Sequence, residues 1–151
     1  MELRKFIERT AATGILGVKI TQNGEDMGKH LWDEECRRNI YSASKSFTSA
    51  AVGIAVKEGL LRLEERLVDA FSEDIPENPN EFLQQATVRD LLTMCLGQQN
   101  AELMGGQRPF YQQKDWVRMS LAFPFTECPG KRFLYNNVGP YLAGILVQRR
   151  A

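Results

Sequence analysis

The sequence lacks a charge imbalance, a long apolar run and a signal-peptide pattern. Nineteen basic residues face nineteen acidic ones, so composition gives no reason to expect nucleic acid or an anionic membrane as a partner. The longest apolar stretches are broken by Lys57, Glu58 or Arg149 before they could span a bilayer. The first ten residues carry charges where a signal peptide needs an apolar segment. The chain as it stands is therefore predicted to be cytoplasmic, but prior removal of a leader would leave the same sequence in the periplasm or outside the cell.

Metal-binding and disulfide patterns are lacking as well. Cys36, Cys95 and Cys128 are far apart and form no C-x-x-C pair, which argues against a zinc site and a disulfide framework. We therefore expect three free, buried thiols. The single histidine, His30, lies in a strand-like run, where a structural histidine is more typical than a member of a Ser-His-Asp triad. No metal and no cofactor are expected.

The residues that are present predict one folded domain. The chain has 151 residues, of which 43% are hydrophobic and 25% charged, enough for a core of its own. Near the front, residues 15–22 and 27–32 are strand-like runs that flank N-G-E-D, a strong hairpin signal. An amphipathic segment over residues 2–9 predicts a short helix before the hairpin.

Helical patterns dominate the rest of the chain. Residues 45–59 are small or apolar on nearly every face until Lys57, and Gly59 stops the run, so the pattern predicts a helix buried on all sides. A polar, proline-bearing connector follows at 72–80. Three later helices are expected: one opening with a capping box of Thr87 and Asp90, one over 114–122, and one beginning near Asn137 with Pro140 in its first turn.

The stretch Y-S-A-S-K-S-F, residues 41–47, places serines and a lysine at a predicted helix start. Residues three apart share a helix face, so Ser42 can present its hydroxyl to Lys45, whereas Ser44 and Ser46 point elsewhere. The helix N-terminus would stabilise a developing oxyanion, and a desolvated Lys45 could take the serine proton. A capping serine beside a solvent-directed lysine explains the same spacing, and one S-x-x-K motif carries little weight alone.

Three segments in a fixed order strengthen the catalytic interpretation. They are residues 41–71, which begin with S-A-S-K after Tyr41; T-V-R-D-L-L-T-M-C-L-G at 87–97; and E-C-P-G-K-R-F-L-Y-N-N at 127–137 with the apolar run after it. In this order they resemble the S-x-x-K nucleophile helix, the T-x-R-D-L-L-T-H-x-S-G stretch and the P-G-x-x-F-x-Y-S-N segment of the serine β-lactamase and penicillin-binding-protein superfamily, specifically its class C-like serine hydrolases. The resemblance covers most of the chain from Ile15 onward.

The resemblance implies roles for four residues. Ser42 would be the acylated nucleophile, with its backbone N–H as one half of an oxyanion hole, and Lys45 its proton-transfer partner. Tyr135 would assist proton transfer to and from the nucleophile and the leaving group, although a tyrosine that merely packs is the plain alternative. Asn137 would hydrogen-bond the lysine and the substrate, and it is also a good helix N-cap. Asn136 stands where the family often has serine.

The superfamily's third motif, K-T-G or H-x-G, has no match after Asn137. The resemblance therefore implies an α+β, β-lactamase/transpeptidase-like fold that is truncated: an N-terminal β-hairpin and a mainly helical region, without the C-terminal strands of the sheet. Residues 1–151 would form a partial domain, with helix and hairpin over 1–40 and the nucleophile helix and helical region over 41–151. A second copy of the chain or a missing C-terminal portion would cover the apolar surface thus exposed.

The predicted function is hydrolysis of an ester or amide through an acyl-enzyme, with a β-lactam, a D-amino-acid peptide or a simple ester as substrate. Because the third motif supplies the second oxyanion donor in this superfamily, the chain alone is expected to be a slow hydrolase at best. The competing hypothesis is a non-catalytic binding or interaction fragment, or a pseudoenzyme, of the same fold.

Overall fold

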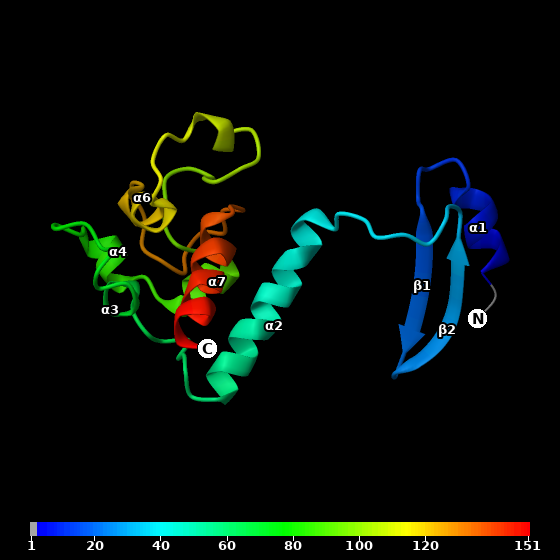
Figure 1. Ribbon diagram of the computed structural model, residues 1–151, viewed down its shortest axis with the longest axis horizontal. Helices are drawn as coiled ribbons and strands as arrows, with labels where there is room; N and C mark the ends of the chain where they lie inside the picture. The colour runs from blue at the N-terminus through cyan, green and yellow to red at the C-terminus, as the bar shows by residue number, and fades with distance from the viewer. Residues whose placement is uncertain (1–2) are drawn as a thin grey trace. The chain divides into compact units, whose positions relative to one another are not determined.

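The computed structural model describes residues 3–151 of a chain that falls into two compact units, Met1–Ile40 and Tyr41–Ala151. Helices and, within the described residues, one two-stranded sheet make up an α+β composition (Figure 1). None of the helices within residues 3–151 is long and apolar enough to cross a membrane.

The first unit is a helix followed by a hairpin. Helix α1 (Arg4–Thr10) precedes strands β1 (Gly17–Gln22) and β2 (Glu25–Leu31), which pair antiparallel. Asn23 and Gly24 form the connecting turn, with φ angles of 52° and 84°. Positive φ at both central residues is what a two-residue hairpin turn requires, so the hairpin predicted from N-G-E-D is confirmed.

The strand boundaries differ from those predicted. Strand β1 begins at Gly17 rather than Ile15, and β2 begins at Glu25 rather than Met27. The second difference has a clear cause, because the turn is complete after two residues and the next two already pair with β1.

Aromatic side chains connect α1 to the hairpin. The ring centroids of Phe6 and Trp32 lie 6.3 Å apart, and the ring of His30 meets Trp32 edge-on at 4.6 Å. Among residues 3–40 no side chain is fully buried, so this unit has no closed core of its own. Glu2, the first residue of the predicted helix, lies outside the described residues.

The second unit is built around three helices, α2 (Ser44–Lys57), α5 (Val88–Thr93) and α7 (Val138–Arg150). Helix α7 packs against both α2 and α5 (Figure 1). A β-carbon on Gly139 of α7 would lie 2.2 Å from the carbonyl oxygen of Leu91 in α5, so glycine allows the two backbones to meet. The buried side chains at these contacts include Val52, Ala55, Val88, Leu91, Val138, Leu142 and Leu146.

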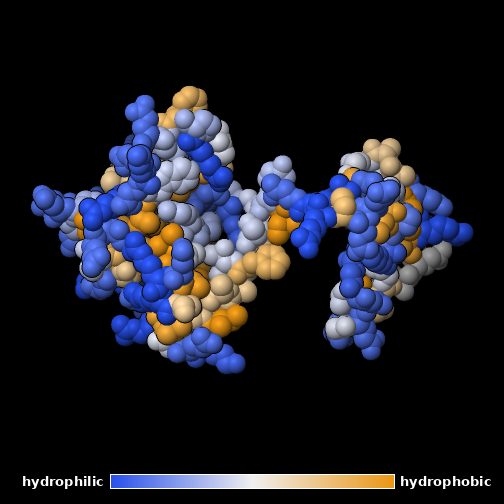
Figure 2. Space-filling model, in the orientation of Figure 1, coloured by the Kyte–Doolittle hydropathy of each residue, from blue (hydrophilic) through white to orange (hydrophobic). Residues whose placement is uncertain are grey.

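Helix α2 is mostly exposed, which corrects the prediction of a helix buried on all sides. Val52 and Ala55 are its buried residues, whereas Phe47 and Ile54 are 71% and 58% exposed. The reason is that α2 packs along one face against α7, and apolar side chains lie at the surface along its course (Figure 2). Composition predicted the helix correctly but could not tell how many of its faces are covered.

Shorter elements complete the second unit, and its two shortest α-helices were not predicted. Helices α3 (Leu67–Ala70) and α4 (Glu81–Gln85) flank the connector at 72–80, and with four and five residues they are too short to show a helical repeat. The remaining elements are the 3-10 turns η1 (Tyr41–Ala43) and η2 (Arg108–Phe110) and helix α6 (Trp116–Ala122).

The predicted start of α5 is confirmed, whereas α6 begins at Trp116, two residues later than predicted. At the start of α5, the Thr87 N–H donates to Asp90 Oδ2 over 2.9 Å and the two side chains complete the capping box. Asp115 caps α6 by accepting from the N–H of Arg118 at 3.0 Å. Pro140 lies in the first turn of α7, where a missing N–H costs nothing.

The three thiols are free, as predicted, but they are not buried. Cys36 is exposed, and Cys95 and Cys128 are half-buried. Within residues 3–151 no three histidine, cysteine, aspartate or glutamate side chains come together as a metal site would need.

Candidate active site

Ser42 lies in η1, the 3-10 turn that leads into α2, and Lys45 follows in the first turn of α2. The three-residue spacing places both side chains on one face, and Lys45 Nζ donates a hydrogen bond to Ser42 Oγ over 3.0 Å. The hydroxyl of Ser44 is engaged elsewhere, because it donates to the carbonyl of Tyr41 at 2.7 Å. Lys45 is therefore paired with Ser42, as the spacing suggested.

The backbone immediately before the serine has an uncommon conformation. Tyr41 has a φ of 45°, in the left-handed region that residues other than glycine seldom adopt. Strain of this kind costs on the order of 1–3 kcal/mol and concentrates at functional sites. No sequence signal marked this position, because glycine or asparagine is the usual sign of a left-handed residue.

Tyr135 completes the group around Ser42. Its hydroxyl donates to Ser42 Oγ over 2.7 Å, and Lys45 Nζ lies 5.1 Å from the centre of its ring. The segment that carries Tyr135 is fixed to the helical unit, since the N–H of Leu134 donates to the carbonyl of Met94 at 2.9 Å. Three of the four residues predicted for the site thus meet at one hydroxyl.

The phenol of Tyr135 is unusually acidic. Its pKa lies below the ordinary value of 10.0, chiefly because of the hydrogen bond with Ser42, and further because of the hydrogen bond with Lys45 and the charge of that lysine. A hydrogen bond donated to a phenolate and a neighbouring cation both favour the ionised form. The ionised form of Tyr135 is therefore favoured relative to that of an isolated tyrosine.

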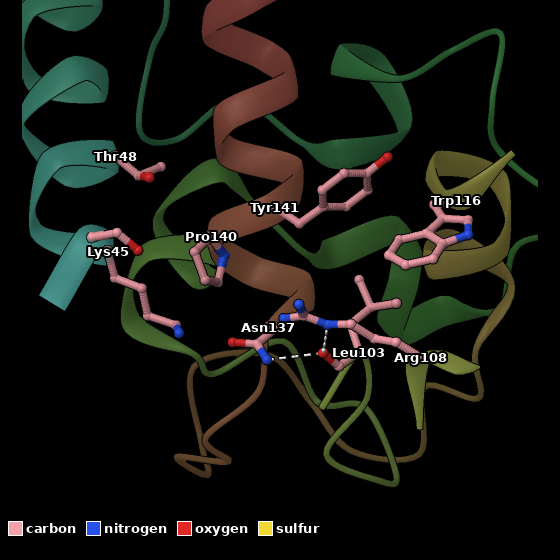
Figure 3. Close-up of a pocket in the computed structure, with 9 residues that line it drawn as sticks. Lys45, Thr48, Leu103, Arg108, Trp116, Asn137, Pro140 and Tyr141 are labelled. Carbon is pink, nitrogen blue, oxygen red and sulfur yellow. Dashed lines mark hydrogen bonds between the residues drawn. The ribbon is translucent and has the colours of Figure 1, made fainter. Parts of the chain in front are cut away.

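Asn137 is placed differently from what the resemblance implied. Its amide nitrogen donates to the carbonyl of Leu103 at 2.9 Å and approaches Met104 Sδ at 3.7 Å. The amide oxygen of Asn137 points toward Lys45 (Figure 3), but no hydrogen bond joins the two side chains.

The side-chain cap of α7 comes from Asn136 rather than from Asn137. Asn137 occupies the N-cap position with φ and ψ of −106° and −4° and makes no side-chain cap, whereas capping side chains usually stand on extended backbone. Asn136 Oδ1 instead accepts from the N–H of Gly139 at 2.9 Å, and its Nδ2 donates to the carbonyl of Leu134 at 2.7 Å. Asn136 is 1% exposed, so its two hydrogen bonds hold the segment next to Tyr135 from within the core.

A pocket of about 310 Å³ opens beside Lys45 (Figure 3). It is lined from α2, from the loop before α6, from α6 itself and from the start of α7, by Ser44, Lys45, Thr48, Leu103, Arg108, Trp116, Asn137, Pro140 and Tyr141. Lys45 belongs to both the pocket and the Ser42 group. Ser42 itself does not line the pocket, and Lys45, whose Nζ donates to Ser42 Oγ, connects the two. The pocket has aromatic walls and a few polar groups of the kind small-molecule sites use.

Sequence reasoning missed the far side of this pocket. Arg108, Trp116 and Tyr141 received no functional role, because none of them belongs to a recognisable motif. Arg108 reaches the pocket through the loop over 101–115, which turns back so that Arg108 Nε donates to the carbonyl of Leu103 at 3.2 Å. Trp116 and Tyr141 reach it from α6 and α7.

The Beta-lactamase family model matches residues 3–151. The chain therefore belongs to the Beta-lactamase family, as its three ordered motifs suggested. The comparison with curated proteins found no match.

Three solved structures share the fold. A protein from Bacteroides dorei DSM 17855 assigned as a β-lactamase has a TM-score of 0.74 at 18% identity, with 98% of this chain and 45% of that chain covered. A protein from Bacillus anthracis assigned as a 6-aminohexanoate-dimer hydrolase has a TM-score of 0.67 at 16% identity, covering 98% and 42%. The D-amino acid amidase from Ochrobactrum anthropi SV3, complexed with L-phenylalanine, has a TM-score of 0.66 at 22% identity, covering 97% and 44%. The β-lactamase-like fold is confirmed, and the chain spans less than half the length of each of these structures.

Proposed function

We propose that this chain carries the acyl-transfer centre of a serine hydrolase that acts on an ester or amide. Two hydrogen bonds to Ser42 Oγ support this most directly. The oxygen accepts one from Lys45 Nζ at 3.0 Å and one from Tyr135 Oη at 2.7 Å. A hydroxyl held between two proton-transfer groups is the arrangement that nucleophilic catalysis requires.

In the proposed reaction Ser42 Oγ attacks the carbonyl carbon and gives its proton to the Tyr135–Lys45 pair. The pair can accept it either at a phenolate beside an ammonium or at an amine beside a phenol, and such coupled groups titrate as a unit. When the tetrahedral intermediate collapses, the pair returns the proton to the departing alcohol or amine, and an acyl-Ser42 remains.

Water then hydrolyses the acyl-enzyme, and the proton transfers of the acylation step run in the opposite order. The pair takes a proton from the water that attacks acyl-Ser42, and Ser42 leaves with that proton restored to its oxygen. The backbone N–H of Ser42 lies in the first turn of η1, where N–H groups have no intrahelical acceptor. Together with the positive end of the 14-residue helix α2, it would stabilise the negative oxygen of both intermediates.

Hydrolysis of p-nitrophenyl acetate by the purified chain tests this proposal. The enzyme-dependent rate should vanish in Ser42→Ala and persist in Ser44→Ala, a matched control two residues away whose hydroxyl is committed to the Tyr41 carbonyl. Equal rates in the wild-type chain and Ser42→Ala would favour the alternative, a non-catalytic binding module of the same fold.

A further inference from the structure

The pocket beside Lys45 has a one-sided charge. Two of its lining residues, Lys45 and Arg108, are cations, and none is acidic, although the chain as a whole has no net charge. The nearby carboxylate of Asp115 is already engaged, because it accepts from the N–H of Arg118 and forms an ion pair with that side chain at 3.4 Å. The electrostatic field in the pocket therefore favours an anionic ligand.

Arg108 is held in place but keeps part of its guanidinium available. Its Nε donates to the carbonyl of Leu103, and within residues 3–151 no carboxylate forms an ion pair with Arg108. The two terminal nitrogens point into the pocket, toward the side of Asn137 and Pro140 (Figure 3). A planar guanidinium with free terminal N–H groups matches the two oxygens of a carboxylate.

Arg108 is exposed, but hydrogen bonds within its loop fix where its side chain starts. The Leu103 carbonyl accepts both Arg108 Nε at 3.2 Å and Asn137 Nδ2 at 2.9 Å, so one oxygen aligns the two polar side chains. Leu103 itself is 2% exposed and has a φ of 58°. The same loop is fixed again by Gln107, whose Oε1 accepts from the N–H of Met104 at 2.8 Å.

Aromatic rings form the wall next to this cation. The centroids of Trp116 and Tyr141 lie 6.3 Å apart in an edge-on arrangement, and Tyr111 supports Trp116 from behind at 6.1 Å. Such a wall offers a flat apolar surface to methylene groups or a ring that joins the reacting carbonyl to an anionic end.

We infer that the pocket selects acyl compounds whose side chain ends in a carboxylate, with Arg108 as the residue that recognises the carboxylate and Trp116 and Tyr141 as the surface that covers the apolar linker. This inference rests on the proposed function for its statement that the bound compound is a substrate. The binding preference itself does not require Ser42 to react, and it can be measured separately.

The test uses the full chain with Ser42→Ala, so that no chemistry occurs, and two ligands of one shape. Glutaric acid monoanilide carries an aromatic ring and a carboxylate, and its neutral counterpart has a primary amide in place of the carboxylate. Isothermal titration calorimetry should show about tenfold tighter binding of the acid, the effect of one charge-assisted hydrogen-bonded pair. Adding Arg108→Gln should remove the preference, and Arg108→Lys should keep part of it, because charge remains while the planar fork is lost.

Arg66→Gln is the matched control, since it removes one arginine of the same unit that pairs with Asp69 outside the pocket. It should leave the preference intact. Equal affinity for acid and amide, no binding of either ligand, or a preference that survives Arg108→Gln in a protein with unchanged circular dichroism would overturn the inference. Failure of ester hydrolysis in the wild-type chain would instead count against the proposed function and leave this measurement unaffected.

Discussion

Tyr135 donates a hydrogen bond to Oγ of Ser42 over 2.7 Å, although the two residues are 93 positions apart in the chain. Lys45, only three residues after Ser42, donates to the same oxygen over 3.0 Å. One contact is local and follows from helix geometry, whereas the other exists only because the segment before α7 returns to the start of α2. Both contacts lie within the second unit, Tyr41–Ala151.

The phenol of Tyr135 should ionise at lower pH than an ordinary tyrosine. Its pKa is lowered mainly by the hydrogen bond with Ser42, so phenolate absorbance assigned to Tyr135 should rise at a pH below 10, and Ser42→Ala should move that midpoint upward. The difference in absorbance at 295 nm between the wild-type chain and Tyr135→Phe isolates this residue. Burial raises the pKa of Tyr111 and Tyr141, which keeps their signals at higher pH. A difference titration centred at or above the ordinary value would contradict this prediction.

The pH dependence of ester hydrolysis should reflect the ionisation of the Tyr135–Lys45 pair. If the Tyr135–Lys45 pair accepts the serine proton, the rate of ester hydrolysis should rise with pH until the pair has lost one proton and then level off. Tyr135→Phe should abolish this dependence together with most of the rate. A Tyr135→Phe variant with an unchanged pH profile would show that Tyr135 only packs against the site.

Lys45 should not be replaceable by arginine. A guanidinium keeps its proton at neutral pH, so Lys45→Arg should lose on the order of a hundredfold or more in hydrolysis rate, as Lys45→Ala should, because general acid–base transfer contributes that much. Stopped-flow or steady-state assays with p-nitrophenyl acetate measure both variants. Substantial activity in Lys45→Arg alone would mean that Lys45 acts as a fixed charge.

The contact between α5 and α7 should tolerate no side chain at Gly139. A β-carbon there would lie 2.2 Å from the Leu91 carbonyl oxygen, and overpacking of this kind costs about 3 kcal/mol in the free energy of unfolding. Gly144→Ala is the matched control on the same helix, since its nearest neighbour is Thr48 Cγ2 at 4.0 Å. That control should stabilise α7 by about 0.5–1 kcal/mol through helix propensity. Urea unfolding followed by circular dichroism compares the two, and equal stabilities would be inconsistent with the close helix contact.

Asn136 should matter for stability more than its place in the Y-N-N motif suggests. Removing Oδ1 in Asn136→Ala leaves the buried N–H of Gly139 without its acceptor, which should cost about 2 kcal/mol in the free energy of unfolding. Asn136→Ser keeps an acceptor oxygen and should lose less. Thermal or urea unfolding distinguishes the two variants, and equal losses would show that the cap contributes little.

The features that the sequence predicted most reliably are those that depend on neighbouring residues. The turn at Asn23 and Gly24, the capping box at Thr87 and the contact of Lys45 with Ser42 each depend on residues at most three positions apart, so a sequence pattern can specify them. The meeting of Tyr135 with Ser42 was expected only from the ordered motifs, because nothing local to either residue indicates it.

Features that depend on tertiary packing were predicted poorly or missed. The apolar residues of α2 could not show which faces are covered, so burial on all sides was expected where Phe47 and Ile54 are exposed. The direction of the Asn137 side chain depends on the Leu103 carbonyl, which a left-handed backbone at Leu103 presents. Arg108 enters the pocket through that same loop, and no pattern in the sequence marks such a conformation.

Covalent labelling tests most directly whether Ser42 is the nucleophile. The wild-type chain, Ser42→Ala and Ser44→Ala are incubated with a fluorophosphonate probe, and adducts are located by intact-mass and peptide mass spectrometry. We predict a single adduct on Ser42, none in Ser42→Ala and retained labelling in Ser44→Ala. An adduct on Ser44, or labelling of Ser42→Ala to the wild-type level, would contradict the proposed acyl-transfer centre.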